Sequence, residues 1–278
     1  MKKLFDEVSY KVSKIVTEKY STSFALGILA LQPAIRPAIY AIYGYVRLAD
    51  EIVDSFHDYD KAALLKRFQN ETDTAIHEGI SLNPILQSFQ ETVKHYKIDF
   101  SLIKQFLHSM EMDLQQIAYN SDQYQEYILG SAEVVGLMCL QVFVEGNAAS
   151  FEKLKPYAMK LGSAFQKVNF LRDIKDDYQT LGRTYFPDVQ MRYFSTEIKL
   201  QIELEIESEF KEALKGIKML PASSRFGVYL AYKYYLSLFK KIKNTPAEKI
   251  MSQRIRIPNS QKLSLAMSSY LQYKIATL

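Results

Sequence analysis

Apolar residues recur at steps of three and four along almost the whole chain, which is the spacing of amphipathic α-helices. Prolines and glycines fall mostly between these periodic stretches, as expected at helix boundaries. No stretch alternates apolar and polar residues as a strand does, and no internal repeat has a fixed period. The pattern predicts an all-α, single-domain protein over residues 1–278, with helices near 3–20, 34–56, 60–78, 83–96, 100–118, 122–145, 151–180, 196–218, 222–244 and 260–275.

The composition agrees with long helices and excludes several classes of protein. Only 10 Gly and 8 Pro occur in 278 residues, and the single cysteine, Cys139, excludes a disulfide framework. The apolar run around Cys139 has the length of a buried core helix. The N-terminal segment turns acidic before any apolar stretch typical of a secretion signal. We therefore expect a cytoplasmic protein. Its basic residues are scattered and its net charge is only +4, which does not indicate a nucleic-acid partner.

Two acidic pairs with the same spacing stand out from this pattern. Asp50 and Asp54 lie in RLADEIVD, and Asp173 and Asp177 lie in NFLRDIKDD. Residues four apart share one face of a helix, so each pair points two mutually repelling carboxylates in one direction. A shared cation removes this repulsion. Carboxylates without His or Cys partners favour a hard ion such as Mg²⁺, which binds few carboxylates together with substrate phosphates.

Other polar residues share the faces of these aspartates: Tyr43 and Arg47 on the first helix, and Asn169 and Asp176 on the second. Aromatic and aliphatic residues surround them, which favours a lined cavity over a solvated helix face. The four histidines are not spaced as HxxxH or HExxH, so zinc and di-iron sites lack their ligands. Two such helices facing each other could bind diphosphate through Mg²⁺, with Arg172 and Arg183 also sharing the negative charge.

These segments resemble the squalene and phytoene synthases, a family of head-to-head isoprenyl diphosphate synthases. The matching segments are RLADEIVD, NFLRDIKDDYQTLGRTYFP, the Ser21-Thr22-Ser23-Phe24 stretch and YILGSAEVVG, in the same order along most of the chain. The resemblance implies an isoprenoid-synthase helical bundle around a central prenyl cavity. It also implies that two prenyl diphosphates condense through a cyclopropylcarbinyl diphosphate, which then ionises and rearranges.

The resemblance further implies a role for each matching residue. Mg²⁺, or Mn²⁺ in its place, would be held by Asp50, Asp54, Asp173 and Asp177, with Asn169 and Asp176 as additional ligands. Diphosphate oxygens would contact Ser21, Ser23, Arg47, Arg172, Arg183, Arg254 and Lys262. The reacting centre would be lined by Tyr43, Tyr127 and Tyr235, which with Arg47 and Arg172 form the predicted catalytic set. Core packing or solvated charge explains three of these equally well: Tyr235, Arg254 and Lys262.

The chain departs from the family pattern at three positions. Lys175 stands where the family usually has Gly, which adds a charge beside the metal site. Ser131 and Glu133 replace residues that are commonly apolar or small in a stretch that should line the prenyl tunnel. The length of the prenyl substrate therefore does not follow from this stretch.

Among the family members, a phytoene synthase is our first choice. It would use two geranylgeranyl diphosphates and no NADPH. The GR-x-YFP segment, and a chain end that lacks a hydrophobic anchor, resemble bacterial carotenoid enzymes. The alternatives are a squalene or dehydrosqualene synthase acting on farnesyl diphosphate, a head-to-tail prenyltransferase or terpene cyclase, and a non-catalytic helical assembly or lipid-binding factor. The intact aspartate pairs disfavour the last of these, and DDxxD is more usual in the head-to-tail enzymes.

The product of such a reaction is hydrophobic and has to leave into lipid. We therefore expect peripheral contact with the inner face of the membrane, supported by the basic residues Lys240, Lys241 and Lys243. The sequence gives no indication of the oligomeric state.

Overall fold

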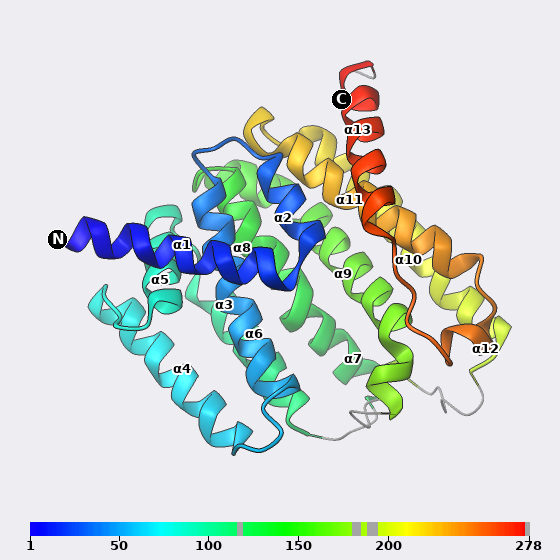
Figure 1. Ribbon diagram of the computed structural model, residues 1–278, viewed down its shortest axis with the longest axis horizontal. Helices are drawn as coiled ribbons and strands as arrows, with labels where there is room; N and C mark the ends of the chain where they lie inside the picture. Colours follow the sequence, from blue (N-terminus) through cyan, green and yellow to red (C-terminus); the bar gives the residue numbers. More distant parts are fainter. Residues whose placement is uncertain (116–118, 180–184, 188–193, 276–278) are drawn as a thin grey trace.

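The computed structural model describes residues 1–115, 119–179, 185–187 and 194–275, and this part of the chain contains helices and no strand. The predicted all-α fold is confirmed (Figure 1). The elements are α1 Lys2–Tyr20, α2 Thr22–Leu29, α3 Arg36–Asp54, α4 Lys61–Glu78, α5 Pro84–Tyr96, α6 Phe100–Asp113, α7 Ser121–Ile128, the π-helical turn η1 Leu129–Glu133, α8 Val134–Phe143, α9 Ala148–Gln179, α10 Thr196–Met219, α11 Ala222–Lys243, α12 Ala247–Ile250 and α13 Asn259–Ile275.

Side-chain caps explain where several helices begin. The Asp60 carboxylate accepts the backbone N–H of Ala63 at 3.0 Å and starts α4. Asn83 caps α5 directly before its proline, and Asn120 forms a capping box with Gln123 at the start of α7. Each cap supplies an acceptor for a backbone donor that the first helical turn leaves unpaired.

The observed elements differ from the predicted ones in four places. The short helices α2 and α12 were not predicted, because one or two turns give too little periodicity. The predicted helix 122–145 is interrupted by η1, since a single π-helical turn shifts the helix face without breaking the apolar run. The predicted helix 100–118 ends already at Asp113.

Two large hydrophobic clusters, with a small third one around Leu140 and Leu154, form the core. In the first, which joins α3 to α5 and α6, the Tyr45 ring stacks on Phe89 with centroids 3.8 Å apart and also contacts Phe106. In the second, Phe210 of α10 packs against Phe239 of α11 at 5.8 Å. Helix α9 packs on α8, α10 and α11, and α3 packs on α1, α5 and α8. Helices α3, α8, α9 and α11, whose arrangement Figure 1 shows, all contribute side chains to one cavity between these clusters.

The stretch Ser121–Phe143, which comprises α7, η1 and α8, is by length and composition able to cross a membrane. It is longer than the apolar run around Cys139 that the sequence singled out. Half of its most apolar window is buried, and Leu137, Met138 and Val142 are at most 2% exposed. Since it packs on α6 and α9, we interpret it as a core helix of the bundle.

A buried ionic cluster joins α9 to α10 on the side of α9 that faces away from the cavity. The Lys167 ammonium, 1% exposed, pairs with Glu209 at 2.9 Å and also with Glu205. Glu209 further accepts hydrogen bonds from Ser163 at 2.8 Å and Lys160 at 3.3 Å. Charges this deeply buried are tolerated only while their partners remain in place.

We expect Lys167→Met to lower the free energy of unfolding by ~3 kcal/mol, because Glu209 then keeps a buried charge without its closest cation. Urea unfolding at pH 7 measures this loss. The double variant Lys167→Met/Glu209→Leu should recover most of it, since both charges are then removed. Wild-type stability of the single variant would contradict the assigned role of the pair.

Candidate active site

A cavity of about 960 Å³ brings the predicted site residues together. It lies between the α1–α2 junction, α3, α8, α9 and α11. Every predicted residue whose side chain is described lines it: Ser21, Ser23, Tyr43, Arg47, Asp50, Asp54, Tyr127, Asn169, Arg172, Asp173, Tyr235, Arg254 and Lys262. Arg183 lies outside the described residues. Asp176 and Asp177 belong to the last turns of α9, but their side chains lie outside the description.

The acidic end of the cavity has donors on two helices. Asp50 and Asp54 reach it from α3, and Asn169 and Asp173 reach it from α9. Within the described part of the chain, no three His, Cys, Asp or Glu side chains gather as a ready-made metal cluster. A set of hard oxygen donors divided between two helices fits Mg²⁺, which completes its shell with water and substrate phosphate oxygens. The residues present therefore fit the predicted cation.

Two guanidinium groups hold the carboxylate of Asp173. Arg172 donates from Nε at 2.9 Å and from Nη2 at 2.5 Å, and Arg254 approaches with Nε at 2.8 Å. Arg254 comes from the segment that follows α12, so residues 81 positions apart meet here. Arg254 thus lies at the cavity wall with its side chain 40% exposed, and its contact with diphosphate stays a prediction. Both arginines lie where an anionic substrate group would meet fixed positive charge.

Arg47 is fixed by contacts on two sides. It forms an ion pair with Glu51 one turn along α3, and its guanidinium lies 4.4 Å from the ring centroid of Tyr20. Its Nε atom is buried and makes no hydrogen bond among the described residues. A buried donor of this kind is unfavourable until an acceptor arrives, and a diphosphate oxygen is a suitable acceptor.

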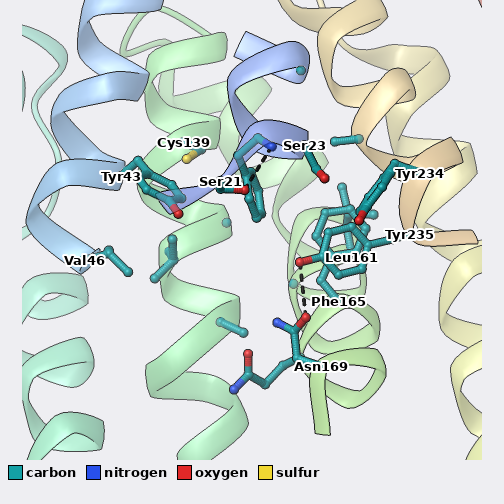
Figure 2. Close-up of a pocket in the computed structure, with 18 of the residues that line it drawn as sticks. Ser21, Ser23, Tyr43, Val46, Cys139, Leu161, Phe165, Asn169, Tyr234 and Tyr235 are labelled. Carbon is teal, nitrogen blue, oxygen red and sulfur yellow. Dashed lines mark hydrogen bonds between the residues drawn. The ribbon is translucent and has the colours of Figure 1, made fainter. Parts of the chain in front are cut away.

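The start of α2 adds further positive potential. The Ser21 hydroxyl caps this helix by accepting the N–H of Phe24 at 3.2 Å (Figure 2). Lys262, from the first turns of α13, donates to the Thr22 hydroxyl at 2.6 Å, and its Nζ lies 5.6 Å from the ring centroid of Tyr234. A helix N-terminus and a lysine at the cavity wall both favour an anion.

Aromatic rings line the cavity next to this charged end. The Tyr235 ring stacks on Phe165 with centroids 3.9 Å apart, and its hydroxyl donates to Asn169 Oδ1 at 3.3 Å (Figure 2). Phe24 lies between Tyr43 and Tyr235, 5.6 and 6.0 Å from their centroids. Burial raises the pKa of Tyr43 to about 12, although Arg47 and the Ser21 hydroxyl lower it. The phenol therefore stays neutral, and these ring faces can stabilise a cation.

Asp113 is a cavity residue that the sequence reasoning missed. It lies at the end of α6, is 6% exposed, and accepts hydrogen bonds from Tyr127 at 2.7 Å and Tyr185 at 3.2 Å. Burial first, and then the charge of Asp113, raise the pKa of Tyr127 well above its ordinary value. No second acidic residue follows at helical spacing. The sequence did contain one signal: Asp113 falls on the same face of α6 as the apolar residues Phe106 and Met110, where a carboxylate is unusual.

Beyond the aromatic rings the cavity becomes apolar and continues along α9. Its wall on this helix runs from Asp173 through Phe165 and Ala158 to Leu154, a distance of ~28 Å at the rise of an α-helix. Cys139 and Phe143 of α8 face the same end. The cavity thus combines a charged mouth with a long hydrocarbon-lined interior.

The two unusual residues near η1 lie on different sides of the cavity wall. Ser131 lines the cavity as predicted, and its buried hydroxyl has no hydrogen-bond partner among the described residues. Glu133 does not line it. The charges acting on Glu133 are those of Lys160, Glu209 and Lys167, the residues of the buried ionic cluster.

Burial raises the pKa of Glu133 from 4.5 to about 6, with Lys160 lowering it and Glu209 raising it. The folded state therefore binds this proton more tightly than the unfolded state, and ionised Glu133 destabilises the fold above about pH 6. We expect Glu133→Gln to raise the Tm at pH 8 by roughly 2 °C. The gain should vanish as the pH falls to 4.5, whereas the exposed Glu152→Gln should change neither value. A gain that does not depend on pH would contradict this origin.

Comparison with known proteins places these features in a family. The model of the family described as squalene/phytoene synthase matches residues 17–261. Phytoene synthase 1 of Solanum lycopersicum is 27% identical over 267 residues, which cover 89% of this chain and 64% of that protein. The 4,4'-diapophytoene synthase of Staphylococcus haemolyticus is 25% identical over 202 residues, covering 71% and 68%. The chain spans 58–66% of the length of the plant phytoene synthases that it matches.

Solved structures of squalene and dehydrosqualene synthases have the same fold. A dehydrosqualene synthase in complex with a ligand superimposes with a TM-score of 0.83 at 19% identity, covering 97% of this chain and 98% of the other. The family match extends over both acidic helices and over most of the cavity wall. The chain therefore belongs to the squalene/phytoene synthase family, whose members condense prenyl diphosphates head to head.

Proposed function

We propose that this protein is a phytoene synthase. It condenses two geranylgeranyl diphosphates, through a cyclopropyl diphosphate, into phytoene, and it needs Mg²⁺ but no NADPH. The observation that carries this proposal is the cavity, whose wall along α9 runs ~28 Å from the charged mouth at Asp173 to the apolar end at Leu154. A fully extended geranylgeranyl chain measures roughly 20 Å, from carbon–carbon lengths of about 1.5 Å. Measured from a diphosphate at the mouth, the cavity is long enough for such a chain.

The charged mouth binds and orients the diphosphate groups. Mg²⁺, held by Asp50, Asp54 and Asp173, would supply charge stabilisation to the departing diphosphate. Arg47, with its unpartnered buried donor, adds a directed hydrogen bond. Arg172 and Arg254 bind Asp173 in the structure, so they already lie beside the place where the diphosphate arrives.

The aromatic section protects the carbocation that remains after the diphosphate departs. Tyr43, Phe165 and Tyr235 present ring faces, which interact favourably with a positive charge. Buried apolar walls keep water away, so the cation rearranges before it is quenched. Asp113 fixes the hydroxyl groups of Tyr127 and Tyr185, and thereby the orientation of both rings at the cavity wall.

A second candidate is condensation of two farnesyl diphosphates. It is favoured by the likeness to a 4,4'-diapophytoene synthase, and the shorter farnesyl chains also fit the cavity. The charged mouth and the aromatic section would act in the same way. The two candidates differ in how far the prenyl chains reach toward Leu154.

A product assay tests the proposal. Purified protein is incubated with Mg²⁺ and either geranylgeranyl or farnesyl diphosphate, with and without NADPH, and the extracted hydrocarbons are identified by mass spectrometry. Phytoene from the C20 substrate without NADPH is the expected result. A C30 hydrocarbon alone would replace the proposal by the second candidate. If a folded sample forms no product from either substrate, the protein is a non-catalytic member of the family.

A further inference from the structure

Helix α1 carries apolar residues on two sides: Val12 and Val16 pack against the core, and further apolar residues lie on the exposed side. The residues that it buries completely are hydroxyl residues, namely Ser9, Ser13 and Thr17, each 0% exposed. Its outer face carries Leu4, Val8 and Ile15, which are 63%, 43% and 55% exposed. These three lie within ~40° of one another around the helix axis. The outcome is an apolar stripe that points to the outside of the protein.

The packing of α1 explains the inward hydroxyls but not the outward stripe. The Ser13 hydroxyl lies 2.7 Å from that of Ser88 on α5, and the Thr17 hydroxyl donates to the Ser13 carbonyl at 2.9 Å. A side chain at Gly44 of α3 would meet Ser13 at 2.9 Å, so small residues allow a close approach here. Helix α1 is thus fixed to α3 and α5 without any contribution from Leu4 or Ile15.

Basic residues outnumber acidic ones beside the apolar stripe. Lys3, Lys11 and Lys19 are exposed and make no ion pair within the described part of the chain, whereas Lys14 pairs with Glu18, and the exposed Glu7 also lies on this side of the helix. Lys11 falls within ~20° of Leu4 around the helix axis. An apolar stripe edged by lysines is typical of a helix that lies in the plane of an anionic lipid surface, with the aliphatic lysine stems reaching toward the headgroups.

The stripe leads to the cavity. Helix α1 lies across the outside of the bundle, and its last residue, Tyr20, lines the cavity together with Ser21 (Figure 1). Leu29, at the end of the following helix, is a further apolar residue with 47% exposure. An uncharged hydrocarbon product needs an apolar phase close to the cavity. The choice of lipid as the partner therefore rests on the proposed function.

We propose that the outer face of α1, formed by Leu4, Val8, Lys11 and Ile15, docks this protein on anionic lipid bilayers. The basic stretch of α11 suits this role less well. Lys241 donates to the backbone carbonyl of Arg256 at 2.7 Å, and Lys243 pairs with Glu207 at 2.5 Å. These two ammonium groups already contact other residues of the protein, whereas Lys3 and Lys11 make no ion pair among the described residues.

Vesicle flotation tests the docking face. The full chain is mixed with vesicles of phosphatidylcholine alone or with a third of phosphatidylglycerol, at low and high salt, in the absence of substrate. We expect wild type to float with the anionic vesicles, and less so at high salt. Leu4→Glu/Ile15→Glu should weaken partitioning at least about tenfold, since it places two charges in the apolar layer.

The matched control is Leu200→Glu/Leu204→Glu, which changes two exposed leucines on α10 that are 51% and 57% exposed. It should float like wild type, and all three proteins should melt alike. Flotation of the α1 variant equal to wild type, equal loss in both variants, or no flotation of wild type at low salt would each overturn the proposal. A mass change of the α1 variant in analytical ultracentrifugation would instead assign the stripe to a second copy of the chain. Because no substrate is present, failure here is separate from failure of the product assay.

Discussion

Replacing Asp50 with asparagine should lower Mg²⁺-dependent turnover on the order of a thousandfold while the helical fold is kept. The substitution preserves the size of the side chain and removes its charge. Asp50 lines the charged mouth of the cavity on the same face of α3 as Arg47 and Asp54. A neutral amide there binds a hard cation far less well than a carboxylate does, so the diphosphate loses part of the charge that stabilises its departure. Single-turnover kinetics and circular dichroism measure the two effects separately.

The control for this substitution has to be chosen from the structure. Glu51 is adjacent in sequence and lies on the flank of the same helix, but it forms an ion pair with Arg47 and so affects the site indirectly. Asp58 is exposed, follows the same helix and does not line the cavity, which makes Asp58→Asn the better match. Asp58→Asn should leave turnover unchanged. Wild-type turnover in Asp50→Asn would show that this carboxylate does not serve the reaction.

The charged mouth could be predicted from the sequence because it is built on two long helices. Helical periodicity fixes which residues of α3 and α9 share a face, so spacing alone assigns Asp50 and Asp54 to one side of α3, and Asp173 to the polar side of α9. The pairing of the two helices was inferred from chemistry, because a shared cation would relieve the repulsion between the carboxylates. Both inferences need only the types of residue and their spacing along the chain, and both can be read from the sequence.

The parts that could not be predicted depend on tertiary contacts. Asp113 is isolated in sequence, and only the meeting of α6 with Tyr127 and Tyr185 makes it part of the cavity wall. Arg254 was assigned to the site only through the family resemblance, and its contact with Asp173, 81 positions away, is one that no periodicity encodes. Glu133 was expected in the prenyl tunnel, but the π-helical turn η1 ends there and the residue faces the ionic cluster instead.

Enlarging Ala158 to phenylalanine should decrease turnover of the C20 substrate at least about tenfold more than turnover of the C15 substrate. Ala158 lies on α9 in the apolar interior, between Leu161 and Leu154 along the cavity wall. With the diphosphate at the charged mouth, as proposed, the last isoprene unit of a geranylgeranyl chain would need the space that an aromatic ring occupies at this position. A farnesyl chain, which is one isoprene unit shorter, would end before it. The ratio of kcat/KM values for the two substrates is the measurement.

The neighbouring residue provides the control, because Met159 packs in the small hydrophobic cluster around Leu140 and Leu154 and does not line the cavity. Met159→Phe places the same aromatic ring on the same helix turn but outside the cavity, so it should leave the substrate ratio unchanged. If Ala158→Phe decreases both turnovers equally, the prenyl chains do not extend along α9 toward Leu154. A selective loss of the C20 reaction would identify this end of the cavity as the part that limits chain length.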